Sequence, residues 1–224
     1  SRLCKFDIVL ANPPYSIKTW NREAFMNDKW GRNFLGTPPQ GRADYAFFQH
    51  ILASMDDKTG RCAILFPHGV LFREQSLREK LIKSDVVECV IGLGANLFYN
   101  SPMEACILIC NNQKRSTLKN KIIFINALKE VTRKNAESYL EKVHIEKIVS
   151  AYFNASEIQN FSTVASLEQI ANYNYNLNIS LYANALNNEN NFNVLSVSET
   201  LSNWKSVHAE MTSSITEMFT LIGK

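Results

Sequence analysis

Short apolar runs alternate with helix-like segments along the first part of the chain, and this alternation restricts the fold more than any other feature. The runs at 6–11, 61–66 and 86–91 have the length of buried strands. The segments 44–57 and 73–84 between them have the spacing of amphipathic helices, and Asp44 is placed to cap the first. This order predicts an α/β fold with a doubly wound sheet.

Two further strands are expected at 105–110 and 122–125, with no helix between them. Lysine and arginine residues crowd the connection, at 114, 115, 119 and 121. We therefore expect these strands to form an antiparallel hairpin at the end of the sheet. A polar helix is expected to follow at about 137–150.

Composition places the chain among ordinary globular proteins. Hydrophobic residues make up 46% and charged residues 20% of its 224 residues, values that exclude disorder. No apolar run approaches the roughly 18 residues of a membrane span, and the first residues lack the apolar stretch of a signal peptide, so we expect a soluble, cytoplasmic protein. The cysteines are odd in number and include no C-x-x-C pair. We expect buried free thiols rather than a metal site at Cys62, Cys89, Cys106 and Cys110.

The expected strand 6–11 ends in Asn12-Pro13-Pro14-Tyr15, the segment with the most specific chemistry. Open α/β sheets bind their ligands at the carboxyl ends of strands. The two prolines fix the backbone and leave the Pro13 carbonyl without a local partner, so this oxygen and the Asn12 side-chain oxygen can both accept from one planar amino group. Such acceptors favour the localised lone pair of an aromatic amine, and Tyr15 offers a flat face to an extruded base. The alternative is an ordinary proline-rich turn.

Residues 16–42 are expected to form a long loop that mixes cations with aromatic rings. Five Lys and Arg residues oppose two acidic ones there, an excess equal to the net charge of +3 of the whole chain. Loops of this length are usually functional or disordered. Cations interleaved with aromatics suit a phosphate backbone and unstacked bases, which makes Lys18, Trp20 and Arg42 candidates for DNA contact. A solvated surface loop is the alternative.

The composition changes near the C-terminus. Ten of the 22 residues from 172 to 193 are Asn, which favours loops and turns. Beyond them, mostly apolar residues recur at alternating spacings of four and three and predict one helix with an apolar seam. This seam is expected to pack against helices of a partner protein or against the chain's own domain. We therefore expect a domain at 1–171, a connector at 172–193 and a tail helix at 194–224. The seam consists of Val197, Leu201, Trp204, His208, Met211, Ile215, Met218 and Ile222.

Several segments together resemble the amino-directed DNA methyltransferases, in particular the modification subunit of type I restriction-modification systems. The resemblance runs from about residue 6 to residue 182. NPPY alone is not specific, because methyltransferases acting on protein glutamine or RNA guanine are similar there. The matching segments are FDIVLANPPY from Phe6, GRADYAFFQH from Gly41, PHGVLFR from Pro67, VIGL from Val90, NLFY from Asn96, HIEKI from His144 and YNLNI from Tyr175.

The resemblance implies a partial Rossmann-like methyltransferase sheet and methyl transfer from S-adenosylmethionine to the 6-amino group of adenine. Asn12 and Pro13 would bind the amine, with Pro14 and Tyr15 completing the catalytic segment, and Phe98 or Tyr99 would pack the other face of the base. The DNA backbone would lie near Lys18, Trp20, Arg42 and Arg73. Double-stranded DNA and the specificity and restriction subunits are the implied partners, with no membrane, and the tail would meet the specificity subunit.

The sequence also departs from the family. Members carry a Gly-rich loop for the cofactor ahead of NPPY, whereas only eleven residues precede Asn12 here and none is glycine. We therefore expect the main cofactor loop to be absent, the chain to be the C-terminal part of a longer enzyme, and the isolated chain to be inactive. Gly92-Leu93-Gly94 lacks a third glycine and a following helix, which excludes a dinucleotide loop.

Two alternatives stay open: a non-catalytic module that binds DNA or a specificity subunit, and an NPPY methyltransferase acting on protein or RNA. In either case, strands missing before residue 6 would expose a hydrophobic edge, so we expect a homodimer or aggregation of the chain.

Overall fold

The computed structural model describes residues 3–98, 102–134 and 137–183, together with positions 201, 204–206, 208, 209, 211 and 212. The chain divides into two units, Ser1–Leu186 and Asn187–Lys224. The first unit contains the sheet, the helices packed on it and the catalytic segment expected from the sequence.

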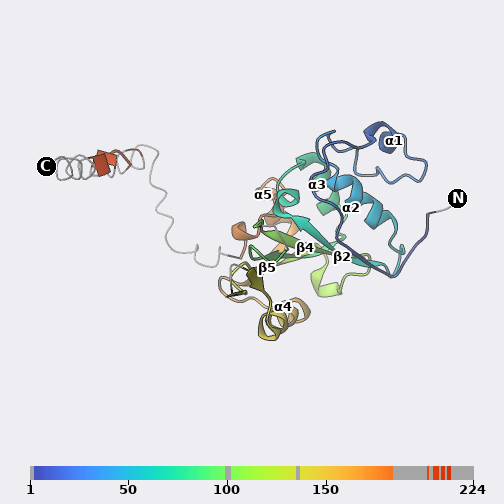
Figure 1. Ribbon diagram of the computed structural model, residues 1–224. Helices are drawn as coiled ribbons and strands as arrows, with labels where there is room; N and C mark the ends of the chain where they lie inside the picture. The colour runs from blue at the N-terminus through green and yellow to red at the C-terminus, as the bar shows by residue number, and fades with distance from the viewer. Residues whose placement is uncertain are drawn as a thin grey trace. The chain divides into compact units, whose positions relative to one another are not determined.

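The first unit is built on a six-stranded mixed sheet with the order β1-β2-β4-β3-β5-β8 (Figure 1). β1 runs parallel to β2 and β3 parallel to β5, whereas β4 and β8 are antiparallel to their neighbours. The expected α/β fold is confirmed, with antiparallel strands added to the parallel pairs. The strands are β1 (Ile8–Ala11), β2 (Arg61–Pro67), β3 (Val87–Leu93), β4 (Ala105–Asn111), β5 (Lys121–Ala127) and β8 (Ser162–Ser166).

The predicted hairpin between the strands at 105–110 and 122–125 is wrong. β4 instead pairs with β2 on one side and with β3 on the other, with Val90 opposite Leu108, and β3 separates β4 from β5. Every residue of β3 is buried, as its place inside the sheet requires. One of the crowded cations, Lys114, is buried and lies 2.6 Å from the Asp85 carboxylate, which anchors the connection beside β3.

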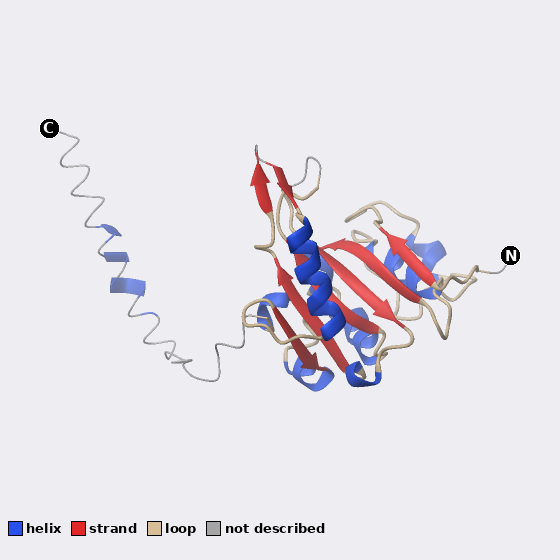
Figure 2. Cartoon of the chain, turned by 90° about the horizontal axis from the view of Figure 1, so that it is seen from below, coloured by secondary structure: helices blue, strands red, loops and turns tan. Residues whose placement is uncertain are grey.

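Helices cover both faces of the sheet. α2 (Asp44–Ala53) and α3 (Gln75–Lys83) lie on the upper face in Figure 1 and pack on a core that includes Phe48, Phe66 and Leu81. α4 (Lys142–Asn154) crosses the opposite face, which is turned toward the viewer in Figure 2, and buries Ile148 and Ala151 in a second core. The shorter elements are α1 (Arg22–Met26), α5 (Leu167–Asn172), η1 (His68–Leu71), η2 (Ser116–Leu118), η3 (Ile179–Leu181) and the paired strands β6 (Thr132–Lys134) and β7 (Glu137–Tyr139).

β1 forms one margin of the sheet, and its exposure differs from the expected buried strand. Val9 and Ala11 pack against the main core, whereas Ile8 and Leu10 on the other face are 57% and 78% exposed. β1 pairs with β2 alone, so its second edge carries no partner strand among the described residues. The strand is therefore an edge strand with one apolar face open.

The segment expected as a connector lies only partly within the described residues. Its first part enters the main core, where Leu177, Ile179 and Tyr182 are buried, and the Tyr182 ring stacks on Phe124 at 4.0 Å between centroids. Residues 184–193 lie outside the described part of the chain. The asparagines at 174, 176 and 178 thus belong to turns that connect buried residues.

The tail is described at few positions. The described positions of the tail are helical, and the Trp204 and His208 rings lie 5.1 Å apart. Leu201, Trp204 and Met211 are exposed. Val197, Ile215, Met218 and Ile222 of the predicted seam lie outside the described residues.

The four strand cysteines are buried free thiols, as predicted, and burial raises the pKa of Cys89 and Cys106. No helix in the described part of the chain is long and apolar enough to span a membrane.

Candidate active site

The Asn12-Pro13-Pro14-Tyr15 segment directly follows the carboxyl end of β1. The Tyr15 hydroxyl donates a hydrogen bond of 2.9 Å to Asn12 Oδ1. Burial is the main cause that raises the pKa of Tyr15, so the hydroxyl keeps its proton and remains a donor at neutral pH. A carboxamide oxygen has two lone pairs, so Asn12 Oδ1 can accept a second hydrogen bond while Tyr15 holds it. Asn12 itself is exposed.

The Pro13 carbonyl provides the second acceptor. Within the described ranges no donor reaches this oxygen, in agreement with the rigid diproline backbone. Two acceptors on consecutive residues therefore lie at the end of β1 with hydrogen-bonding capacity to spare.

Asp44 fixes the chain immediately after this segment. Asp44 Oδ1 accepts a hydrogen bond of 2.9 Å from the backbone N–H of Ser16, whose φ of 50° lies in the left-handed region. Asp44 is only 7% exposed and occupies the first turn of α2. Its predicted capping role is wrong, because the N-cap is Ala43 and the Asp44 carboxylate faces the loop instead. The acidic side chain thus joins the catalytic segment to α2.

A pocket of about 680 Å³ opens beside Asn12, over the face of the sheet opposite α2. It brings together Asn12 and Phe98, which the sequence analysis assigned to the amino group and to one face of the same base. Tyr99 lies outside the described residues. We call this the Asn12 pocket; its lining residues are Leu10, Ala11, Asn12, Ala63, Leu65, Leu93, Leu97, Phe98, Ile107, Ser138, Tyr139 and Leu140.

Two of the predicted DNA-contact residues lie in the loop that follows Tyr15. Lys18 is exposed. Trp20 Nε1 donates to the Gln40 carbonyl at 2.7 Å, and the Gln40 amide returns a hydrogen bond of 2.9 Å to the Trp20 carbonyl. This reciprocal pair closes the long loop near its two ends, so the loop between them is fixed at its base.

The other two predicted cations gather around an acidic residue that sequence reasoning missed. Arg42 Nη1 lies 3.0 Å from Glu74 Oε1, and Arg73 lies over the Phe72 ring at 5.8 Å. Burial raises the pKa of Glu74, and Arg42 and Arg73 oppose that shift. Glu74 adopts a left-handed conformation just before α3, for which the sequence offers no signal. Arg42 thus forms an ion pair with Glu74, and the nearby charge of Arg73 also stabilises the Glu74 carboxylate.

The Gly92-Leu93-Gly94 segment allows close packing at the end of β3. A Cβ on Gly94 would approach the Leu128 carbonyl oxygen to 2.6 Å, and one on Gly92 would approach Ile179 to 2.7 Å. Both glycines therefore allow neighbouring segments to lie close to the end of β3.

Comparison with known proteins places the chain in a family. The family model described as N-6 DNA methylase matches residues 1–191. A type I restriction enzyme MjaVIII methylase subunit from Methanocaldococcus jannaschii is 34% identical over 210 residues, which cover 88% of this chain and 35% of the relative. The MpnII methylase subunit of Mycoplasma pneumoniae is 31% identical, with 80% of this chain and 34% of the relative covered.

Solved structures show the same likeness. The type I restriction-modification methyltransferase subunit from Streptococcus thermophilus superposes with a TM-score of 0.72 at 38% identity, covering 80% of this chain and 38% of that one. The chain thus spans about a third of the length of the curated relatives it matches. With the family model matching most of its length, the chain belongs to the N-6 DNA methylase family.

Proposed function

We propose that the protein carrying this chain methylates the 6-amino group of adenine in double-stranded DNA, as the modification subunit of a type I restriction-modification system. The observation that carries the proposal is the pair of acceptors at the end of β1: Asn12 Oδ1, on a residue that lines the Asn12 pocket, and the Pro13 carbonyl next to it in the chain. The type I methylase relatives support the choice of DNA as substrate.

The acceptors act on the amine. An exocyclic aromatic amine is a poor nucleophile because its lone pair is delocalised into the ring. Hydrogen bonds from its two N–H groups to Asn12 Oδ1 and the Pro13 carbonyl favour the pyramidal form with a localised lone pair, and fixed dipoles of this kind stabilise the charge that develops on nitrogen. The hydrogen bond from Tyr15 orients the Asn12 carboxamide for this purpose.

The base must leave the duplex to reach these acceptors. The apolar lining of the Asn12 pocket, with Phe98 on one side, suits a flat heteroaromatic ring. Tyr15 contributes its ring beside Asn12, and either Phe98 or Tyr99 packs the opposite face. The tight hydroxyl contact between Tyr15 and Asn12 adds a positioning role for Tyr15 to the stacking role inferred from the sequence.

The family uses S-adenosylmethionine, which supplies an electrophilic methyl group when it is bound. The described residues around Asn12 do not fit the whole cofactor, since the pocket lining holds no acidic side chain for ribose hydroxyls. The space beside Gly92 and Gly94, at the end of β3, is occupied by neighbouring residues of the chain. Residues outside this chain hold most of the cofactor in this proposal, and the isolated chain is inactive for that reason.

DNA and protein partners complete the proposal. Lys18 and Trp20 on the loop, with Arg42 and Arg73 beside Glu74, contact the DNA backbone. The specificity and restriction subunits are the protein partners, as the type I names of the relatives suggest. The seam of the tail contacts the specificity subunit, and the exposure of Leu201, Trp204 and Met211 supports this assignment.

The test is the identity of the methylated product. Labelled S-adenosylmethionine is incubated with the protein carrying this chain, its specificity subunit and either unmodified duplex DNA or the same DNA already methylated at adenine N6. Label is expected only in the unmodified DNA, as 6-methyladenine. Label in a protein glutamine or in RNA would favour the other NPPY chemistries, and absence of any transfer would favour a non-catalytic module.

A further inference from the structure

A second pocket, of about 810 Å³, lies on the loop that follows the catalytic segment, between α1 with the residues after it and the outer side of α2. It shares no lining residue with the Asn12 pocket. We call it the tryptophan pocket; it is lined by Trp20, Asn21, Glu23, Ala24, Phe25, Asn27, Asp28, Lys29, Trp30, Arg32, Ala43, Ala46, Phe47 and His50.

Aromatic rings form much of its wall. Trp20 meets Phe25 edge to face, with 5.8 Å between ring centroids, and Phe47 contributes from α2. Trp30 is 38% exposed, although tryptophan is a residue that folding tends to bury. The wall thus offers flat aromatic surface that is open to a planar ligand.

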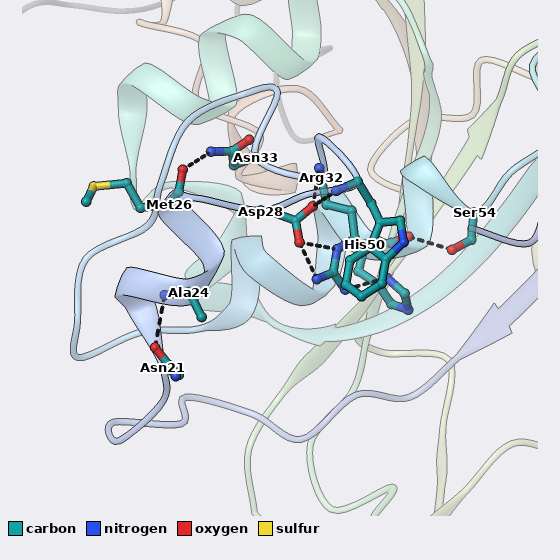
Figure 3. Close-up of polar contacts among 9 residues, drawn as sticks. Asn21, Ala24, Met26, Asp28, Arg32, Asn33, His50 and Ser54 are labelled. Atoms are coloured by element: carbon teal, nitrogen blue, oxygen red, sulfur yellow. Dashed lines mark hydrogen bonds and ion pairs between the residues drawn. The ribbon is translucent and has the colours of Figure 1, made fainter. Parts of the chain in front are cut away.

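Asp28, Arg32 and His50 form a fixed polar cluster in this pocket (Figure 3). Arg32 Nε donates to Asp28 Oδ1 at 3.0 Å, and Arg32 Nη1 lies 3.2 Å from His50 Nδ1. The hydrogen bonds from Arg32 lower the pKa of Asp28 to about 2, so the carboxylate is charged and holds the guanidinium in place. The Arg32 guanidinium in turn lies 4.7 Å from the centre of the Trp30 ring.

The same cluster leaves donors for a ligand. Burial and the Arg32 charge lower the pKa of His50, so its ring is neutral at pH 7. A neutral His50 that accepts from Arg32 at Nδ1 carries its proton on Nε2, where it can donate to another group. Lys29 Nζ, 4.3 Å from the centre of the Trp30 ring, makes no ion pair within the described residues.

We propose that the tryptophan pocket binds an unstacked nucleobase of the DNA, with Lys29 on the neighbouring phosphate. Base stacking on aromatic side chains next to a free cation is the usual chemistry of single-strand recognition. The inference rests on the proposed action on DNA and adds a second contact to it. The tryptophan pocket lies close in the chain to the catalytic segment, which supports the assignment. Only four residues separate Tyr15 from Trp20. On the other wall, Ala43 directly precedes Asp44, whose carboxylate accepts the hydrogen bond from Ser16.

A nucleobase fits this lining better than an apolar peptide does. The Asn21 and Asn27 carboxamides and His50 place hydrogen-bonding groups around the rings, as the polar edges of a base require. The lining carries two positive side chains, Lys29 and Arg32, and two negative ones, Glu23 and Asp28. Arg32 is hydrogen-bonded to Asp28, so Lys29 is the cation that can contact an anionic ligand.

Tryptophan fluorescence tests the proposal without any methyl transfer. The sequence has three tryptophans, so Trp204→Phe leaves only Trp20 and Trp30 as reporters. This variant of the full chain is titrated with a short single-stranded oligonucleotide and with an abasic strand of the same length and charge. We expect quenching by the oligonucleotide, and binding of the abasic strand about tenfold weaker or less.

Two further substitutions in the same background locate the binding. Trp30→Ala is expected to weaken oligonucleotide binding about tenfold, and Lys29→Gln, on an exposed side chain, to weaken it less and to reduce its salt dependence. Lys119→Gln removes the charge of another exposed lysine outside the pocket lining, serves as the matched control for Lys29→Gln, and is expected to bind the oligonucleotide as before. Binding is read without S-adenosylmethionine, so a failure of methyl transfer would leave this pattern unaffected. That pattern separates this proposal from the proposed activity.

Three outcomes would overturn the inference. Equal binding of the abasic and normal strands would show that only phosphates are contacted. Unchanged binding by folded Lys29→Gln and Trp30→Ala, with unaltered thermal unfolding, would place the strand elsewhere. Quenching by an amphipathic peptide, with none by the oligonucleotide, would identify a protein contact.

Discussion

Two hydrogen bonds fix the catalytic segment, and both involve side chains whose roles the sequence only partly indicates. Tyr15 holds the Asn12 carboxamide, and Asp44 holds the backbone of Ser16. The second bond joins the segment to the buried Asp44 carboxylate, where water competes less for the donor and acceptor, whereas the first bond is exposed. The orientation of the Asn12 oxygen therefore depends on the Tyr15 hydroxyl, and the backbone that follows is held by Asp44, which is not part of the pocket lining.

Substitution of Tyr15 separates its two roles. Tyr15→Phe keeps the ring but removes the hydroxyl that orients Asn12, and a net hydrogen bond of about 1 kcal/mol predicts a kcat reduced about fivefold with KM for DNA unchanged. Tyr15→Ala also removes the stacking surface and is expected to raise KM. Steady-state methylation kinetics on duplex DNA measure both constants. A Tyr15→Phe protein with wild-type kcat would exclude the positioning role.

Asp44 is predicted to stabilise the fold through its bond to Ser16. Asp44→Ala removes a partly buried, charge-assisted hydrogen bond to the Ser16 N–H, so we expect a loss of about 1–3 kcal/mol in the free energy of unfolding. Asp57→Ala is the control, because its exposed carboxylate pairs with Lys5 at the surface, an interaction worth about 0–1 kcal/mol. Urea unfolding of this chain measures both, and equal losses would contradict the anchoring role.

The elements of the sheet show where sequence patterns succeed. Apolar runs predicted β2, β3, β4 and β5, and helical spacing predicted α2 and α3. These patterns are local, because a strand buried on both faces is apolar throughout and a helix buried on one face is apolar at every third or fourth residue. Strand order is not local. β4 enters between β2 and β3 because its apolar residues on both faces fit an interior position, and no pattern in β4 itself specifies its neighbours.

Other elements escaped prediction for similar reasons. β8 and α5 lie among Ser, Thr and Asn residues whose partners are supplied by tertiary contacts, for example Ser162 opposite Ile125. A phenylalanine shortly after a strand usually packs in the core, so the sequence pattern alone did not mark Phe98 as a site residue. Only the resemblance to the methyltransferases did. The position of Asn12-Pro13 at a strand end was predictable because prolines terminate strands, whereas the Glu74 cluster depends on a left-handed residue in the loop before α3.

The loop element around α1 has its own pH dependence. The Asp28 pKa of about 2 lies below the ordinary value of 3.8, so Asp28 stabilises the fold above about pH 4 and loses this contribution as the pH falls through 2. Asp28→Asn is therefore expected to lower the urea midpoint at pH 6 relative to wild type. The difference between the two proteins should shrink between pH 4 and pH 2. A difference that grows on acidification would contradict the Asp28–Arg32 pairing as its source.

The whole first unit presents one open edge and one open apolar face at β1. Ile8 and Leu10 face away from the main core, and β1 pairs with β2 alone among the described strands. Exposed edges of this kind pair with other chains unless charge or cover prevents it. The catalytic segment lies at the end of that same strand, so whatever covers the edge also lies close to Asn12.

Self-association of the chain is the predicted consequence. Light scattering over a range of concentrations is expected to show dimers or larger species. Leu10→Lys should shift the chain toward monomer, because a charged side chain on an edge strand opposes pairing. Val143→Lys, on the exposed side of α4, is the matched control and should leave association unchanged. A monomer at high concentration would contradict the prediction.

Asn12 and Pro13 are proposed to hold an adenine amino group for methylation. The most direct measurement is single-turnover methylation of unmodified duplex DNA by the wild-type protein carrying this chain and by its Asn12→Ala variant, with 6-methyladenine identified by mass spectrometry. We expect 6-methyladenine from the wild type and a rate about 10²–10³ lower for Asn12→Ala, with DNA binding retained, because the variant loses a dipole that stabilises the transition state. Equal rates, or methylation of any other group, would contradict this proposal.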